Sequence, residues 1–493
     1  MENKDREKDI IRAVNENKNI LLHGCGGAGK TYMLKEIARH MIARNKNVCC
    51  TATTGIAAIN LSLKEYGISG STLHSWSGVG LGNGSDSFLV SMVLKNVNAV
   101  KRWRNTDLLI VDEISMLGGS FIDKLDYVGR SIRRCADKPF GGIQVIFSGD
   151  FLQLPPVNDK WAFTSFAWRE FEFTSFILEQ PKRYPNVQWF EMLLRIRKGQ
   201  HTLEDVKFLH TRVTAYQEYK KSIESNKDVV IVKPTILYSK KIDVEAENEK
   251  EINKLPGKFK EFVATDLFTA ITSHAKYEYY IKPLDETIPK VLCFKVGAQV
   301  MLKANLDPAM GLVNGSRGVI TELHEDSVGV KWVNGNTDTI SPHVWEQEDK
   351  DGKMKRSQIP LILAWCITIH KSQGATLDFA VGNLGPSVFC DGQAYVALSR
   401  VRSPEGLLLT EFYPLSIKTN KEALEYVDKL GCLPEIPSDP NFLRKFEKEE
   451  KVEKRHFKIK EDPHALPSRR ILKPNLTKIE SFSYKDCVLN FCS

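Results

Sequence analysis

The sequence of 493 residues lacks any apolar run of transmembrane length, and its ten cysteines include neither a C-x-x-C pair nor the Cys/His spacing typical of zinc sites. A membrane-spanning helix needs about 20 consecutive apolar residues, so the sequence predicts no such helix. The charged segment 1–9 is followed closely by an apolar strand, and we therefore expect no signal or transit peptide. Reduced cysteines are typical of nuclear or cytoplasmic proteins, and we expect this protein to be soluble and nuclear or cytoplasmic.

The sequence also has little excess charge outside its C-terminal end. The chain carries 69 Lys and Arg against 61 Asp and Glu, a net charge of +8. Residues 441–493 hold 13 basic and 8 acidic residues, a net +5, so only about +3 remains for the rest of the chain. So weak an overall field argues against nucleic-acid binding by the whole surface, and any such site must be a local groove. The length exceeds what one hydrophobic core supports, which predicts two to four domains.

A glycine-rich segment, GCGGAGKT at residues 24–31, matches the phosphate-binding pattern G-x-x-x-x-G-K-[ST]. It follows an apolar run at 20–22 and precedes a helical pattern at 33–39, which is the strand–loop–helix context of a phosphate-binding loop (P-loop). Glycine permits positive φ angles, so successive backbone N–H groups can point at phosphate oxygens beside a helix N-terminus. A glycine-rich turn without a ligand is the alternative, but it explains neither the Lys-Thr ending nor the flanking elements.

This segment predicts binding of a nucleoside triphosphate. We expect Lys30 to reach the β and γ phosphates and the Thr31 hydroxyl to hold Mg²⁺. The predicted nucleotide-binding residues of the loop are Gly26, Gly27, Ala28, Gly29, Lys30 and Thr31.

Two carboxylates end a second apolar run at residues 108–111, in the position called Walker B in P-loop enzymes. Asp112 is predicted to bind Mg²⁺ and Glu113 to orient or deprotonate the attacking water. A third apolar run at 143–148 leads into a proline-stiffened turn that carries Gln153. A glutamine here is able to sense the γ-phosphate, because its amide both donates and accepts hydrogen bonds. A surface glutamine in a turn is the alternative.

Polar residues at two further positions suggest contacts with a sugar-phosphate backbone. Thr53 and Gly55 follow the predicted buried strand 48–52, at the carboxyl edge of the sheet where ligands bind in open α/β folds. A capped helix start is the alternative there. Thr72 and His74 lie in the segment STLHSW, whose hydroxyls and rings suit a sugar-phosphate and base surface.

The second half of the chain mixes helical, parallel and antiparallel patterns. Segments 229–237 and 361–369 each read as a buried strand, and residues 240–255 and 190–196 have helical spacing. Between them, alternating residues at 328–333 and 337–340 flank an Asn-Gly pair, which is a hairpin signal. We therefore predict a small β-barrel inserted at about 319–358.

Several segments in unbroken order resemble one known family, from about residue 20 to about residue 413. They are DEISM at 112–116 with FIDKLD at 121–126, GDFLQLPP at 149–156, LVNGSRG at 312–318, IHKSQGATLD at 369–378 and YVALSRVR at 395–402. Together they resemble the petite-integration-frequency helicases, in the 5′-to-3′ branch of helicase superfamily one. The chain departs from that family in one respect, because no adenine-reading glutamine precedes the P-loop at residues 5–9.

The resemblance implies roles for residues of the second half. It implies that Arg183 and Arg400 reach the nucleotide across a domain cleft and neutralise charge on the transferred phosphoryl group. A surface salt bridge is the alternative for Arg183, and a helix-to-loop salt bridge is the alternative for Arg400. It also implies residues near the nucleotide at Gln373 and Gly374, and contacts with the DNA backbone at His370, Lys371 and Ser372.

The expected fold class is α/β, with two RecA-like P-loop domains of parallel sheets flanked by helices and ATP between them. The expected domains are residues 1–178, with a short insertion at about 77–104, and residues 179–432, with the barrel. The resemblance implies an ATP- and Mg²⁺-dependent helicase that moves 5′ to 3′ on single-stranded DNA and unwinds duplex or structured DNA. A DNA-stimulated ATPase that displaces bound proteins is the alternative, and a P-loop kinase or GTPase switch is disfavoured because it needs no second-domain arginines.

The remaining segment, 433–493, is a basic tail. Residues 478–484, KIESFSY, faintly resemble a sliding-clamp-binding peptide but lack its leading glutamine and second adjacent aromatic residue. A clamp or replication partner is one interpretation of this segment, and packing on the chain's own domain or an unpartnered terminus is the other.

Overall fold

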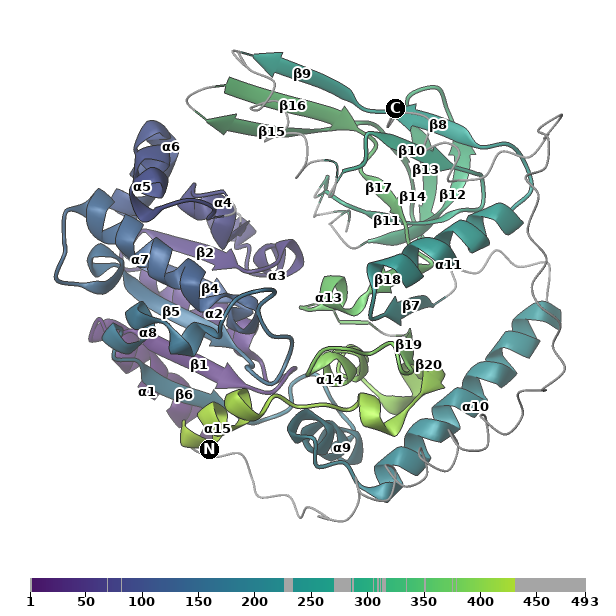
Figure 1. Cartoon of the computed structure of the whole chain (residues 1–493), viewed down its shortest axis with the longest axis horizontal. Coiled ribbons are helices and arrows are strands. Elements are labelled where there is room, and N and C mark those ends of the chain that lie inside the picture. The colour runs from purple at the N-terminus through teal and green to yellow at the C-terminus, as the bar shows by residue number, and fades with distance from the viewer. Residues whose placement is uncertain are drawn as a thin grey trace, which may run out of the picture.

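The computed structural model describes residues 2–430 except 69, 81, 226–233, 270–284, 286–287, 305, 308–309, 311, 313–315, 334, 350–351, 375 and 378. The predicted tail at 433–493 and the first part of the predicted strand 229–237 therefore lie outside the described residues. None of the helices in the described part of the chain combines the length and the apolar character needed to cross a membrane. Figure 1 shows two parallel sheets side by side, with antiparallel strands above the second of them.

The first parallel sheet has six strands in the order β3-β2-β4-β5-β1-β6. Its strands β1 and β4 are buried along their whole length, because helices cover both faces. Leu21 faces one hydrophobic core, while Ile20 and Leu22 face the other, as the alternation of a strand requires. The strands are β1 Ile20–Gly24, β2 Val48–Ala52, β3 Ser71–Thr72, β4 Leu108–Asp112, β5 Gln144–Gly149 and β6 Thr174–Leu178.

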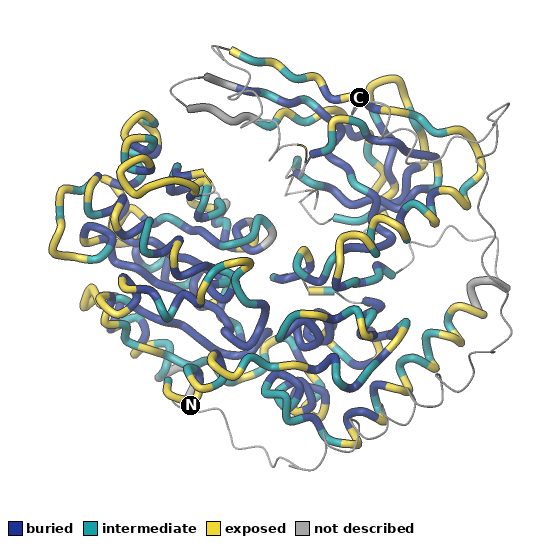
Figure 2. The backbone as a smooth tube through the Cα atoms, in the orientation of Figure 1, coloured by how far each residue is buried: buried dark blue, intermediate teal, exposed yellow. Residues whose placement is uncertain are grey.

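Helices pack on both sides of this first sheet and bury its inner strands β2, β4, β5 and β1, which Figure 2 shows as dark blue inside a lighter shell, while the edge strands β3 and β6 are more exposed. The predicted short insertion at about 77–104 contains helix α5 and nearly all of helix α6, and both helices pack against α7. The helices are α1 Glu2–Asn15, α2 Lys30–Ile42, α3 Gly55–Asn60, α4 Leu73–Ser77, α5 Asp86–Lys95, α6 Val97–Asn105, α7 Gly119–Arg133 and α8 Phe166–Glu170.

The second parallel sheet has four strands in the order β18-β7-β19-β20. Its core joins the helices that precede and follow these strands, and Tyr395, Leu409 and Ile196 all contribute to it. The strands are β7 Thr235–Tyr238, β18 Cys366–Thr368, β19 Ala380–Leu384 and β20 Leu407–Phe412. The helices are α9 Val187–Lys198, α10 Leu203–Ser225, α11 Lys241–Lys254, α13 Ile369–Ser372 and α14 Gln393–Leu398.

The predicted single strand at 361–369 is two strands in two different sheets. Residues β17 Leu361–Leu363 pair with the antiparallel sheet, and β18 begins at Cys366 in the parallel sheet. The Asn248 side chain of α11 accepts a hydrogen bond from the Cys366 N–H and donates to the Cys366 carbonyl, which holds the start of β18. A continuous apolar run gives no sign of this break, because both halves are buried.

Antiparallel strands extend beyond the predicted 319–358 insert on both sides. A five-stranded sheet has the order β14-β13-β12-β11-β17, and β15, β16 and β9 form a three-stranded sheet. The predicted hairpin between residues 328 and 340 is present as the pair β13 and β14. The strands are β8 Lys260–Val263, β9 Thr265–Thr269, β10 Val291–Phe294, β11 Gln299–Leu302, β12 Arg317–Leu323, β13 Val328–Trp332, β14 Thr337–Ile340, β15 His343–Asp349 and β16 Gly352–Gln358. Long-range pairing such as that of β9 with β16 leaves no local signal at 265–269.

The last described helix, α15 Lys421–Lys429, returns from the second sheet to the first. Ala423 and Val427 are buried in the core of the first sheet. Tyr426 stacks on Phe163 at 4.0 Å between ring centroids, and its hydroxyl accepts a hydrogen bond from Trp168 Nε1 at 3.0 Å. The two parallel sheets are therefore connected twice, once between β6 and α9 and once between β20 and α15 (Figure 1).

Candidate nucleotide site between the two parallel sheets

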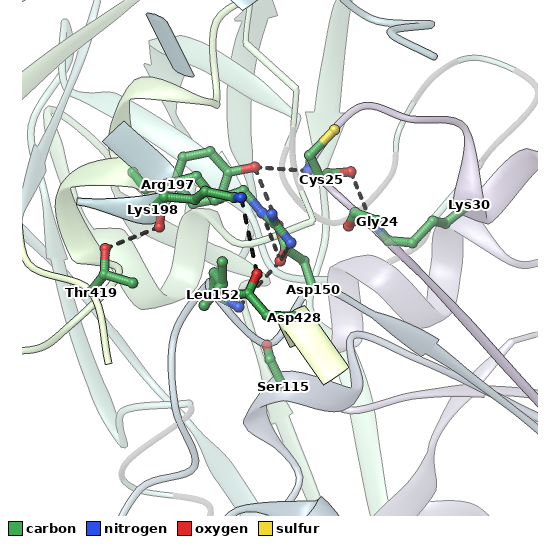
Figure 3. Close-up of polar contacts among 12 residues, drawn as sticks. Gly24, Cys25, Lys30, Ser115, Asp150, Leu152, Arg197, Lys198, Thr419 and Asp428 are labelled. Carbon is green, nitrogen blue, oxygen red and sulfur yellow. Dashed lines mark hydrogen bonds and ion pairs between the residues drawn. The ribbon is translucent and has the colours of Figure 1, made fainter. Parts of the chain in front are cut away.

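The P-loop lies between β1 and α2, and its backbone takes the left-handed conformations that its glycines permit. Gly27 has φ +82°, and a Cβ there would lie 2.7 Å from Cβ of Arg183, so only glycine fits. The backbone N–H groups of Lys182 and Arg183 both donate to the Gly27 carbonyl. Lys30 Nζ donates to the carbonyls of Gly24 and Cys25 at 2.8 and 2.9 Å (Figure 3).

The predicted Mg²⁺ ligands lie together at the end of β4. The Thr31 hydroxyl donates to Asp112 Oδ2 at 2.9 Å, and the Ser148 hydroxyl donates to Asp112 Oδ1 at 3.0 Å. Burial, and next the charge of Glu113, raise the pKa of Asp112 to about 6. A hydroxyl and a carboxylate in contact at a P-loop are the donor set that Mg²⁺ takes in enzymes of this kind.

Glu113 adopts a left-handed backbone conformation with φ 57°, which is uncommon for a residue other than glycine. The Thr53 hydroxyl donates to its carbonyl at 2.8 Å. Gln373, which comes from the second parallel domain, donates through Nε2 to Glu113 Oε2 at 3.1 Å and to the Ser115 hydroxyl at 3.2 Å. Gln373 was predicted to lie near the nucleotide. In the structure its side chain contacts Glu113, the predicted catalytic carboxylate.

The two predicted arginines approach the P-loop from the other side of the cleft. Arg183 Nη1 donates to the Ser399 carbonyl at 3.0 Å. Arg400 is 1% exposed, and its Nε donates to the Val396 carbonyl at 2.8 Å. Burial, and next the charge of Arg183, lower the pKa of Arg400 to about 10, so the guanidinium still carries its charge at neutral pH.

A cavity of about 330 Å³ lies at this meeting point of the two parallel sheets. Its wall carries more positive than negative side chains, and such a wall complements the charge of a polyphosphate. The basic residues in the wall are Lys30, Lys182, Arg183, Arg400 and Arg402, and the acidic ones are Asp112 and Glu113. The other predicted residues that line it are Gly26, Gly27, Gly29, Thr31, Gln153 and Gly374.

Two buried amide oxygens at this site have no hydrogen-bond partner within the described part of the chain. They belong to Gln153 and Gln373, which are 4% and 0% exposed. A buried acceptor left alone costs free energy, so a bound molecule that donates to it is favoured. The cavity, its charge and the Thr31–Asp112 pair fit a nucleoside triphosphate with Mg²⁺, and a water held beside the terminal phosphate would donate to these amide oxygens. Ala28 does not line the cavity, because its methyl group is buried in the second core.

The predicted DNA-binding residues occupy two segments, one on each parallel domain. On the first, Gly55 begins α3, and the Thr72 hydroxyl caps α4 by accepting from the Ser75 N–H. His74 stacks on Phe121 with ring centroids 4.3 Å apart. These contacts leave the half-buried Thr72 and His74 at one edge of the sheet, where β2 and β3 end.

On the second domain, the predicted DNA-binding residues lie on the one-turn helix α13. The ring of His370 stacks on that of the exposed Phe389 with the ring centroids 6.4 Å apart, and Lys371 is exposed. Ser372 is fully buried, its hydroxyl donates to the Ile369 carbonyl, and its own carbonyl accepts from Arg400 Nη1. The side chain of Ser372 therefore faces inward rather than the surface, because the single turn of α13 divides its residues between surface and core.

A buried ion pair beside the P-loop was not predicted from the sequence. Arg197 of α9 donates through Nε and Nη2 to both oxygens of Asp150 at distances between 2.6 and 3.0 Å (Figure 3). The two side chains are 1% and 0% exposed. Burial acts to raise the pKa of Asp150, but the charge of Arg197 outweighs it and the pKa lies below its usual value. The pair joins β5 of the first sheet to a helix of the second core.

We expect Asp150→Ala to lower the free energy of unfolding by about 3–5 kcal/mol, because it leaves the Arg197 charge buried and unpaired. Chemical denaturation followed by tryptophan fluorescence measures this loss. Replacing both residues, as Asp150→Ala with Arg197→Met, should recover part of it, since no charge then remains buried. A loss below about 1 kcal/mol for Asp150→Ala would contradict the assignment of the pair as a buried, mutually dependent unit.

Comparison with known proteins agrees with this geometry. The family model "PIF1-like helicase" matches residues 2–207, and the model "DNA helicase Pif1, 2B domain" matches residues 285–323. The crystal structure of the Pif1 helicase from Candida albicans is 31% identical, with a TM-score of 0.74, over 86% of this chain and 99% of that one. The chain belongs to the PIF1-like helicase family. Its parallel sheets are accordingly the two RecA-like domains of that family, and its small antiparallel sheets accompany the second.

Two other members of the PIF1-like family are similar to the chain over most of its length. The ATP-dependent DNA helicase PIF1 of Danio rerio is 36% identical over 432 residues, covering 85% of this chain and 63% of the relative. The chain spans a little under two thirds of the length of the first curated relatives it matches. The structure of a Bacteroides Pif1 helicase in complex with ADP-AlF3 and ssDNA is 28% identical, with a TM-score of 0.62, and covers 86% of this chain and 96% of that one.

Proposed function

We propose that this protein is an ATP-dependent DNA helicase that moves 5′ to 3′ on single-stranded DNA and unwinds duplex or structured DNA. One observation carries the proposal: the P-loop cavity is completed by basic side chains from the second RecA-like domain. A P-loop protein that only binds nucleotide does not need arginines from another domain, whereas a motor that closes and opens a cleft does. The family supports the direction of movement, and the Bacteroides relative bound to ADP-AlF3 and ssDNA supports the two ligands.

In this proposal, each side chain of the cavity has a defined task. The P-loop amides and Lys30 hold the triphosphate, and Thr31 with Asp112 holds Mg²⁺, which neutralises phosphate charge when bound. Glu113 accepts a proton from the attacking water, and Gln153 donates from its amide Nε2 to the terminal phosphate. Further polar groups come from the second domain, and they are Arg183, Arg400, Gln373 and Gly374.

The proposed path of single-stranded DNA runs over Thr53, Gly55, Thr72 and His74 of the first domain and over His370 and Lys371 of the second. The path is supported by the contact of Gln373 with Glu113, because Gln373 directly follows α13. A movement of α13 on DNA binding would therefore reach the catalytic carboxylate through one residue. We expect the DNA affinity to fall with rising salt and to depend little on base sequence.

The proposed function is tested by ATP hydrolysis with and without single-stranded DNA, followed by strand displacement on substrates with a 5′ or a 3′ overhang. We expect hydrolysis to rise severalfold with DNA, and displacement only from the 5′ overhang. Displacement of a bound protein without strand separation would instead support the remodelling ATPase. A rate of ATP hydrolysis that does not change when single-stranded DNA is added would contradict both the helicase and the remodelling ATPase.

We also propose domain limits of 1–178 and 179–432, and a nuclear or cytoplasmic location. The free thiols of the described cysteines support the location, because oxidising compartments favour disulfides. The antiparallel strands support an inserted barrel in the second domain that is longer than 319–358. A sliding clamp or another replication partner for the tail remains part of the proposal and rests on sequence alone.

We expect a chain truncated after Pro434 to unwind naked DNA at nearly the rate of the full chain, because the cavity and the proposed DNA path precede that residue. The truncated chain should bind DNA more weakly, since residues 441–493 carry +5 of the net +8 charge. Strand displacement and salt-dependent DNA titration of both chains measure the two effects. Loss of DNA-stimulated hydrolysis on truncation would show that the tail belongs to the motor.

A further inference from the structure

One amide of the P-loop makes a direct contact with the second domain. The Gly26 N–H donates to the hydroxyl of Tyr395 at 2.8 Å. A Cβ at Gly26 would lie 3.3 Å from that hydroxyl and 3.7 Å from Oγ of Ser399, so helix α14 and its C-terminal end approach the loop closely. The contact therefore fixes how far the loop and α14 lie apart.

The hydroxyl of Tyr395 also bonds to the buried ion pair of Asp150 and Arg197. It donates to Asp150 Oδ2 at 3.2 Å, and Asp150 is in turn held by Arg197. Burial and the charge of Asp150 raise the pKa of Tyr395 well above its usual value, so the hydroxyl stays protonated and keeps its donor. The result is a directed chain of hydrogen bonds from Gly26 through Tyr395 to Asp150.

Tyr395 also lies on the same short segment as the arginine that completes the cavity. Arg400 follows α14, and its Nε donates to the Val396 carbonyl, which is the residue next to Tyr395. Its Nη2 donates to the Ser399 hydroxyl at 2.9 Å. These bonds attach Arg400 to α14. The hydrogen bond between Tyr395 and the P-loop therefore also sets the position of the Arg400 guanidinium relative to the phosphates of a bound nucleotide.

We propose that Tyr395 is a positioning residue for ATP hydrolysis, which aligns Arg400 with the P-loop by linking the Gly26 amide to the buried Asp150–Arg197 pair. The hydroxyl touches no reacting atom. It acts through Arg400, and its contribution is made only when the cleft is closed. The proposal rests on the proposed ATPase function of the same cavity and adds a residue to which the family resemblance assigned no role.

The decisive variant is Tyr395→Phe, which removes the hydroxyl and keeps the packed ring. We expect kcat of DNA-stimulated hydrolysis to fall about tenfold or more, while KM and the Kd of a fluorescent nucleotide change less than about threefold. In the Arg400→Ala background, single-turnover hydrolysis should fall less than about twofold further, because the tyrosine acts through the arginine. Tyr426→Phe is the matched control, since it removes a half-buried hydroxyl that is bonded to Trp168 instead of the P-loop.

Three results would overturn the proposal. They are normal kcat in Tyr395→Phe, an equal loss in both backgrounds, and the same loss of kcat in Tyr426→Phe. The last two would show a merely structural effect of a buried hydroxyl. If the wild-type chain itself shows no DNA-stimulated hydrolysis, the proposed function fails and this inference fails with it, and that result is distinct from a defect confined to the variant.

Discussion

Replacement of Arg400 by alanine is expected to lower DNA-stimulated ATP hydrolysis by about 10³-fold or more, which corresponds to about 4 kcal/mol of transition-state stabilisation. The guanidinium is buried in the wall of the cavity, and it keeps its charge there because a pKa of about 10 lies well above neutral pH. Its effect is largest on the charge that develops during phosphoryl transfer, so nucleotide affinity should change only a few-fold. Unwinding should fall in parallel with hydrolysis.

Steady-state hydrolysis at saturating DNA, together with a fluorescent-nucleotide titration, measures the Arg400→Ala effect. Arg400→Lys is the matched control, and we expect it to restore little, because an ammonium group cannot reproduce the planar fork that bonds to the Val396 carbonyl and the Ser399 hydroxyl. Near-normal turnover in Arg400→Ala would remove the arginine from the chemistry. It would also remove the strongest link between the second domain and the phosphates.

Lys30→Ala is expected to abolish measurable hydrolysis and to weaken nucleotide binding, because it removes the single cation of the P-loop itself. In the structure Lys30 Nζ is bonded to two carbonyls of the loop, and it is 8% exposed. Those bonds place the ammonium group at the floor of the cavity, where the charge of a triphosphate would replace the two carbonyls as its partner. The same variant should therefore lose both DNA-stimulated hydrolysis and unwinding.

Glu113→Gln separates binding from chemistry at this site. The amide keeps the size of the carboxylate and loses its basicity, so we expect nucleotide and DNA to bind while turnover falls far below that of the wild type. Nucleotide titration and single-turnover hydrolysis of Lys30→Ala and Glu113→Gln, side by side, provide the comparison. Wild-type turnover in Glu113→Gln would contradict its assignment as the base, and hydrolysis in Lys30→Ala would contradict the P-loop assignment.

The residues that sequence predicted best are those whose chemistry is local in the chain. Lys30, Thr31 and Asp112 were predicted from a glycine-rich loop and from a strand that ends in two acids, and the structure brings them into one cavity with Arg183 and Arg400. Their roles stay predictions until they are measured. Ser372 shows the limit of this approach, because a motif names a residue without showing which way a one-turn helix will point it.

The residues that sequence missed depend on contacts between distant segments. Asp150 and Tyr395 both lie inside recognisable motifs, but nothing at either position shows that a residue 245 positions away is its partner. Arg197 looks like one more basic residue at a helix end until burial and its bonds to Asp150 are known. The strands β8 and β9 were missed for the same reason, since their partners lie later in the chain.

The docking of α15 on the first domain bears on how the proposed motor moves. The segment that leads into α15 lies beside α9. The Thr419 hydroxyl donates to the Arg197 carbonyl, and Nζ of Lys198 lies 4.0 Å from Oδ1 of Asp428. We expect two connections that lie side by side to restrict the relative movement of the two domains to a rotation while α15 stays docked. A small rotation of the second domain near the P-loop would then displace parts of that domain farther from the two connections by a larger distance.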